Sequence, residues 1–71
     1  MNLYEIRWDR DTRRYYITEP GGHRWFKDWE GTYEYVFQAA KKNAPAVVKH
    51  HKADGSVKEY KVEAYPLKRF S

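Results

Sequence analysis

The residues most suggestive of chemistry lie near the end of the chain, where two adjacent histidines precede an aspartate. The segment Lys49 to Tyr60 has the sequence KHHKADGSVKEY. Imidazole nitrogens and carboxylate oxygens bind metals and act as general acids and bases. Either kind of site requires these groups to converge on one point. The local backbone therefore decides whether the segment can form one.

The flanking residues predict a β-hairpin. Two β-like runs, AVVKHH and SVKEYKVEAY, are joined across KADG, and Asp-Gly between such runs is a hairpin signal. A three-residue loop, 53–55, with a left-handed Gly55 places Lys49 opposite Glu59. Neighbours along a strand point to opposite faces, so His50 and His51 cannot bind one metal together. We therefore predict a structural role for the segment, with Asp54 as a turn residue.

Other combinations of reactive residues are weaker still. His23 is the third histidine, cysteine is absent, and no glycine-rich phosphate-binding motif or serine nucleophile motif occurs. The carboxylate pairs Asp9/Asp11 and Asp28/Glu30 stand beside basic residues and fit turns and helix caps better than an acid–base dyad. We expect no catalytic activity, no metal site and no cofactor.

The secondary-structure elements that position these residues are predicted from the spacing of apolar residues, which changes twice along the chain. Residues 3–27 alternate in three short runs separated by polar turns, which predicts an antiparallel meander. After Gly31 the spacing becomes helical, and a helix is predicted over about 32–43. Asp28 or Thr32 caps its start, and Asn43 takes a left-handed conformation after its end. Its apolar stripe comprises Tyr33, Val36, Phe37 and Ala40.

The order β-β-β-α-β-β predicts an α+β fold. We expect a two-layer sandwich: an antiparallel sheet with one helix packed on one face. The predicted sheet core comprises Ile6, Ile17, Val48, Tyr60 and Val62. Residues 1–66 form a single domain, and residues 67–71 form a C-terminal tail.

Size and composition bound the function. A chain of 71 residues without cysteine buries a small core, so stability must come from its 13 aromatic residues or from self-association as a homodimer. No apolar run is long enough to span a membrane, and no membrane partner is expected. The cytoplasm is the simplest location.

Charge and aromatic residues suggest where a partner would bind. The first 30 residues are charge-balanced, and the surplus of +4 lies in residues 31–71. Side chains alternate between the two faces of a strand, so residues next to the helix-facing ones should lie on the other face of the sheet. We expect basic and aromatic groups to gather on that face. The predicted binding residues are Arg13, Arg14, Tyr16, Arg24, Phe26, Lys49 and Lys58.

The C-terminal hairpin also carries a family resemblance. Its residues VVKHHKADGSVKEYKVEAY resemble the end of a family of short, uncharacterised bacterial proteins with a V-V-x-H-x-x-D-G-x-(I/V) hairpin. The similarity covers most of residues 4–65 and implies the fold, but no activity. Residues 15–17 depart from the family's Trp-x-Val.

A more general likeness is to DNA-binding domains of plant and integrase type, in which a helix follows three strands. This order covers residues 3–43. It would make Arg7 and Trp25 additional contacts beside the arginines already named.

Two functions follow from these observations. The first is a non-catalytic module that binds nucleic acid through a basic and aromatic sheet face. The alternative is a protein-interaction module, such as an adaptor or a viral inhibitor of a host protein, that docks on an acidic protein surface through exposed Tyr, Trp and Arg.

Overall fold

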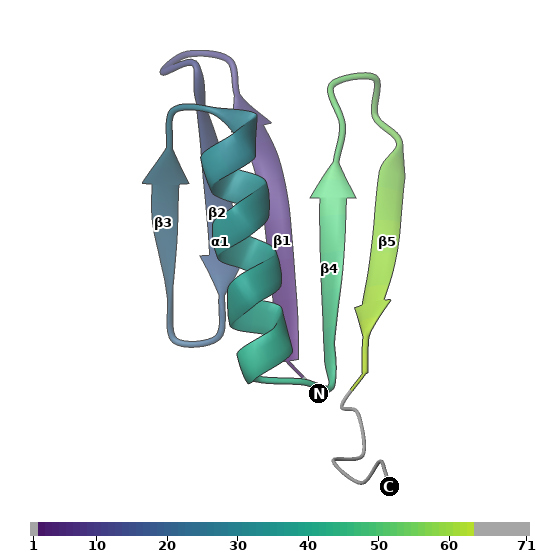
Figure 1. Cartoon of the computed structure of the whole chain (residues 1–71). Coiled ribbons are helices and arrows are strands. Elements are labelled where there is room, and N and C mark those ends of the chain that lie inside the picture. Colours follow the sequence, from purple (N-terminus) through teal and green to yellow (C-terminus); the bar gives the residue numbers. More distant parts are fainter. Residues whose placement is uncertain (1, 64–71) are drawn as a thin grey trace, which may run out of the picture.

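The protein forms one five-stranded sheet with a single helix lying across one face (Figure 1). The structure is a computed structural model, and it describes residues 2–63. The elements are β1 (Asn2–Asp9), β2 (Arg14–Glu19), β3 (Gly22–Phe26), α1 (Trp29–Lys42), β4 (Ala46–His51) and β5 (Val57–Val62). This confirms the α+β fold in two layers. The predicted tail, residues 67–71, lies outside the described residues.

The sheet is mixed rather than wholly antiparallel. The strand order is β3-β2-β1-β4-β5, and β1 pairs with β4 in parallel while the other three pairs are antiparallel. The chain leaves β3, descends through α1 and re-enters the sheet as β4, beyond β1 (Figure 1). This crossover is right-handed, as parallel connections through a helix almost always are. The first strand in the sequence is therefore the central strand of the sheet.

The core lies between α1 and the three strands in the middle of the sheet. Ile6, Ile17 and Val48 are fully buried, as predicted, and Val36 of the helix packs against them. Tyr60 and Val62 of β5 pack partly buried at the margin of this cluster. We call the sheet face under α1 the covered face.

The predicted apolar stripe of the helix is rotated in the structure. Val36 and Ala40 are buried, as predicted, but Thr32 occupies the inward position that we assigned to Tyr33. The Thr32 hydroxyl donates to the Asp28 carbonyl oxygen at 2.7 Å, which satisfies its polar group inside the core. Tyr33 is 46% exposed at the flank of the helix.

Both ends of the helix differ in part from the prediction. Asp28 is the N-cap, as one of the two alternatives had it, and its carboxylate accepts from the Gly31 amide at 2.7 Å. The helix therefore begins at Trp29, three residues early. A Cβ on Gly31 would lie 2.9 Å from the Asp28 Oδ1, so glycine at this position makes room for the cap.

Asn43 does not take the left-handed conformation that we predicted. Its φ is −109°, and its amide side chain instead donates to the Tyr4 hydroxyl at 2.9 Å and to the Ala39 carbonyl at 3.1 Å. Asn2 donates in turn to the Asn43 carbonyl. These contacts satisfy carbonyl groups at the helix end, so a left-handed residue is not required.

The hairpin between β4 and β5 has the predicted register. Lys49 lies opposite Glu59 and Val48 opposite Tyr60, while Gly55 has the predicted positive φ, 91°. The Asp54 carboxylate accepts from the Ser56 amide and hydroxyl at 2.9 and 2.6 Å, which holds the turn and keeps the pKa of Asp54 below its ordinary value. Asp54 is thus a turn residue, as predicted.

Candidate binding surface on the open face of the sheet

The sheet face opposite α1 carries no second layer among residues 2–63, and we call it the open face. Strand alternation and the observed register assign its side chains. They are Leu3, Glu5, Arg7 and Asp9 of β1; Arg14, Tyr16 and Thr18 of β2; His23 and Trp25 of β3; Val47, Lys49 and His51 of β4; and Val57, Glu59 and Lys61 of β5.

One row of this face crosses all five strands, and we call it the central row. Trp25 lies beside Tyr16, Tyr16 beside Arg7, Arg7 beside His51, and His51 beside Val57. Aromatic groups thus occupy one end, basic groups the middle and a β-branched residue the other end.

The aromatic end of the row forms a shallow hollow. The rings of Tyr16 and Trp25 are 4.7 Å apart, and that of His23 is 5.4 Å from Tyr16. Trp25 remains 44% exposed. Arg7, Trp8 and Asp9 complete the lining of this hollow, which has a volume of about 420 Å³. A planar ligand could stack here with a guanidinium group within reach.

A second hollow adjoins the first and is mainly basic. It measures about 410 Å³ and is lined by Arg7, Trp8, Arg10, His51, Lys52 and Ala53. Arg7 and Trp8 line both hollows, so the two lie side by side. The β1–β2 and β4–β5 turns, which supply Arg10 and Lys52, extend beyond the same end of the sheet (Figure 1). This arrangement suits a negatively charged ligand.

Glu5 fixes the basic groups at the middle of the row. Its Oε1 accepts from Arg7 Nη2 at 2.9 Å and lies 2.8 Å from His51 Nε2. The hydrogen bond with His51 lowers the pKa of Glu5, and the charge of Arg7 acts in the same direction against the effect of burial. One carboxylate therefore holds two cationic or potentially cationic groups in position.

The structure separates the predicted binding residues. Tyr16, Arg14 and Lys49 belong to the open face, and Arg13 lies in the β1–β2 turn with a positive φ of 57°. The remaining three, Arg24, Phe26 and Lys58, lie on the covered side.

The expectation that Arg24 and Phe26 share a face with Tyr16 is therefore wrong. The Pro20–Gly21 turn pairs Tyr16 with Trp25 and Tyr15 with Phe26, so Phe26 faces α1. There its ring packs 5.2 Å from that of Tyr35.

Arg24 and Lys58 project from the covered side of the sheet, although both remain exposed. Arg24 Nε donates to Glu19 Oε2 at 3.1 Å, and its guanidinium lies 5.0 Å from the centre of the Tyr35 ring. Lys58 pairs with His50, and its ammonium lies 5.4 Å from the Tyr60 ring. Neither residue can contact a ligand that lies on the central row.

Trp25 was named as a contact only through the likeness to DNA-binding domains and His51 was not named as one, but the pairing shows how both could have been assigned to the open face from the sequence. A two-residue Pro-Gly loop fixes which residues of β2 and β3 are opposite each other, and that count places Trp25 beside Tyr16. His51 follows from the predicted β4–β5 register, but its contact with Glu5 requires the parallel β1–β4 pairing. Alternation within one strand does not predict that pairing.

The two adjacent histidines point to opposite faces, as predicted. His50 stacks on Trp29 under the helix at 4.5 Å, whereas His51 contacts Glu5 on the open face. Burial lowers the pKa of His50, and the charges of Lys52, His51 and Lys58 act in the same direction. Within residues 2–63, no group of three or more His, Cys, Asp or Glu side chains could hold a metal ion.

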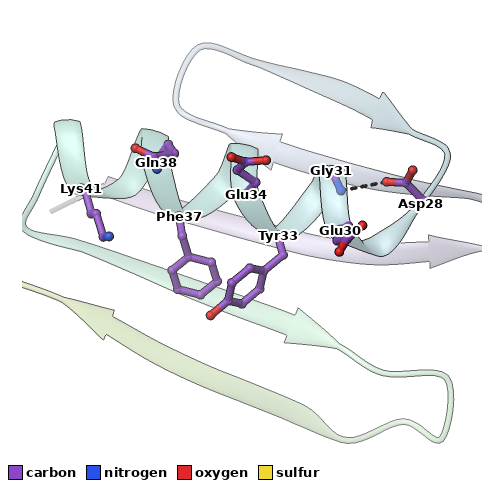
Figure 2. Close-up of a pocket in the computed structure, with 8 residues that line it drawn as sticks. All are labelled: Asp28, Glu30, Gly31, Tyr33, Glu34, Phe37, Gln38 and Lys41. Carbon is purple, nitrogen blue, oxygen red and sulfur yellow. Dashed lines mark hydrogen bonds between the residues drawn. The ribbon is translucent and has the colours of Figure 1, made fainter.

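A further hollow of about 580 Å³ lies along the outer flank of α1. Figure 2 shows the rings of Tyr33 and Phe37 projecting from the helix toward β4 and β5, with Glu30, Glu34, Gln38 and Lys41 along the helix. Phe37 meets Tyr60 edge-on at 5.2 Å. The mixed charges of this flank favour no one class of ligand.

Comparison with protein-family models, curated proteins and solved structures finds no match to this chain. Within the part of the chain that the structure describes, no helix has the length and apolar character needed to cross a membrane.

Proposed function

We propose that this protein is a non-catalytic module that binds single-stranded nucleic acid on the open face of its sheet. The observation that carries the proposal is the exposed Trp25 beside Tyr16 on an uncovered sheet, with Arg7 next to them in the central row. Bases stack on such rings while basic groups contact the phosphates.

The aromatic pair favours single strands over duplexes. In a duplex the base faces are already stacked, whereas the unpaired bases of a single strand are free to stack on protein rings. The two adjoining hollows would place bases over Tyr16 and Trp25, and phosphates near Arg7, Arg10 and Lys52.

The test is a titration of the full chain against fluorescent single-stranded and duplex oligonucleotides at about 50 and 200 mM salt. We expect tighter binding of the single strand and a steep loss of affinity with salt. Stacking of a base on an aromatic side chain contributes ~1–3 kcal/mol, so Trp25→Ala should weaken binding about tenfold. Arg7→Ala should also reduce the salt dependence by about one phosphate contact.

Each variant has a matched control on the other side of the molecule. Arg24→Ala removes an arginine held against Glu19 on the covered side, and Tyr33→Ala removes an exposed ring from the helix flank. Neither should alter binding. Equal loss from Arg7→Ala and Arg24→Ala would indicate diffuse charge attraction instead of a site. Absence of binding at the lower salt would refute the proposal in favour of a protein partner.

A further inference from the structure

The outer edge of β5 is open, because β5 is the last strand in the sheet order among residues 2–63. An open strand edge offers unpaired backbone N–H and C=O groups to any strand that lies beside it. Its sequence is VKEYKV, in which Val57, Tyr60 and Val62 are apolar or aromatic and Lys58, Glu59 and Lys61 are charged. Whether this edge suits a particular partner depends on which residues direct their backbone groups outward.

The hairpin geometry settles which residues those are. The Lys52 amide donates to the Ser56 carbonyl at 2.9 Å, so the backbone groups of Ser56 point toward β4. In an antiparallel pair this direction alternates along the strand. The backbone groups of Lys58, Tyr60 and Val62 therefore also point toward β4. Those of residues 57, 59, 61 and 63 point to the open edge.

We propose that β5 pairs antiparallel with β5 of a second copy of this chain, with Tyr60 on the two-fold axis. In an antiparallel pair, residues with outward-pointing backbone groups must lie opposite each other. This excludes every register in which the numbers of two opposed residues add up to an odd number. Centring the axis on Glu59 would place Glu59 opposite itself, and centring it on Lys61 would place Lys61 opposite itself. Centring it on Tyr60 places Glu59 opposite Lys61 of the second copy, twice by symmetry.

This register also joins like side chains on the helix side of the sheet. Tyr60 lies opposite Tyr60 of the second copy, next to the helix flank that carries Tyr33 and Phe37. The resulting sheet has ten strands. Because the axis is perpendicular to the sheet, both helices lie on one side and both open faces on the other.

The first test is the mass of the full chain by sedimentation velocity between about 10 and 500 μM, a range suited to an interface smaller than about 1,200 Å². We expect a reversible dimer. Lys61→Glu creates two Glu–Glu contacts across the axis and should weaken dimerisation about tenfold or more. The double variant Glu59→Lys, Lys61→Glu restores both pairs and should restore the dimer.

Lys58→Glu is the control, because it makes the same charge change in the same strand but lies opposite Val62 of the second copy. It should leave the dimer intact. A monomer throughout the concentration range would overturn the proposal. Failure of the double variant to recover the dimer, with its circular dichroism unchanged, would overturn the register.

A crosslinking experiment tests the axis directly, since the chain has no cysteine of its own. Opposed residues in a non-hydrogen-bonded pair have Cβ atoms about 4.5–5.5 Å apart, close enough for a disulfide after small adjustments. Tyr60→Cys should crosslink to a covalent dimer under mild oxidation, and Lys58→Cys should not. Equal crosslinking of both variants would contradict an axis at Tyr60.

Discussion

The two faces of the sheet are built from the same strands but differ in burial: one is covered by the helix and the other is exposed. On the covered face, Ile6 and Ile17 are completely buried under α1. On the open face, Leu3 and Trp25 keep 42% and 44% of their surface exposed. Both faces carry aromatic and apolar residues, so the composition of the strands alone does not distinguish them. The difference shows that the position of the helix decides which residues are buried in the core and which remain exposed.

The largest effect should come from removing a side chain of the covered face. Ile6→Ala creates a cavity under the helix and should lower the free energy of unfolding by about 2–5 kcal/mol. This is a large part of the total free energy of unfolding of a small domain. Leu3→Ala, in the same strand but on the open face, should cost less than about 1 kcal/mol. Urea denaturation measures both. Similar losses of stability from Ile6→Ala and Leu3→Ala would mean that the two faces contribute equally to the stability of the fold.

The flank of the helix should give an intermediate effect. Phe37 is only partly buried, against Tyr60, although the sequence pattern predicted a central position for it. Phe37→Ala should therefore cost about 1–3 kcal/mol, less than the 3–5 typical of a buried phenylalanine. The same urea measurement applies. A loss equal to that of Ile6→Ala would show that Phe37 belongs to the core after all.

Acid should destabilise the covered face through His50. Its folded-state pKa lies below the value of 6.5 that the unfolded chain has, because burial against Trp29 disfavours the imidazolium. The unfolded chain therefore takes up this proton first as the pH falls. The contribution to stability is complete above about pH 6.5 and is lost as the pH falls through the folded-state pKa.

Unfolding in urea at pH 7.5, 6.5 and 5.5 measures this loss, and each pKa unit of difference corresponds to about 1.4 kcal/mol. His50→Phe keeps the stacked ring and removes the proton, so its stability should change less over this range. Identical profiles for the wild type and His50→Phe would contradict the assignment.

The smallest effect should come from the open-face histidine. His51→Ala removes a partly exposed contact with Glu5 and should cost less than about 1 kcal/mol at pH 7. It should also raise the pKa of Glu5, which the contact lowers. In the wild type, the stability that Glu5 contributes is present above about pH 4.5 and is lost as the pH falls through its lowered pKa. NMR titration of the Glu5 carboxylate checks this shift, and an unchanged pKa would exclude the contact in solution.

The sequence predicted those features of the fold that depend on local chemistry. The Asp-Gly turn determined the β4–β5 register and the positive φ of Gly55, while Asn43 and Pro45 located the end of the helix to within a residue. The start of the helix was misplaced because Gly31 is a poor helix former. In the structure, that glycine instead makes room for the Asp28 cap.

The features that the sequence did not predict depend on contacts between distant segments. The parallel β1–β4 pairing brings His51 to Glu5, and no local pattern in either strand indicates it. Of the predicted binding residues, Tyr16, Arg14 and Lys49 lie on the open face. Arg24, Phe26 and Lys58 were placed on the wrong face, because the assignment did not follow the pairing through each turn.

The central position of β1 has a consequence for how the protein folds. Asn2 pairs with Ala46, so β1, which precedes the other strands of this sheet in the chain, is completed on one side by a strand that follows much later. The β1–β2–β3 meander can form from local contacts, but the parallel pair must close a long loop, a step that is intrinsically slow. During synthesis, the edge of β1 that later pairs with β4 therefore stays unpaired until β4 is made. In that interval it can pair with strands of neighbouring nascent chains. We expect docking of the C-terminal hairpin to limit the folding rate.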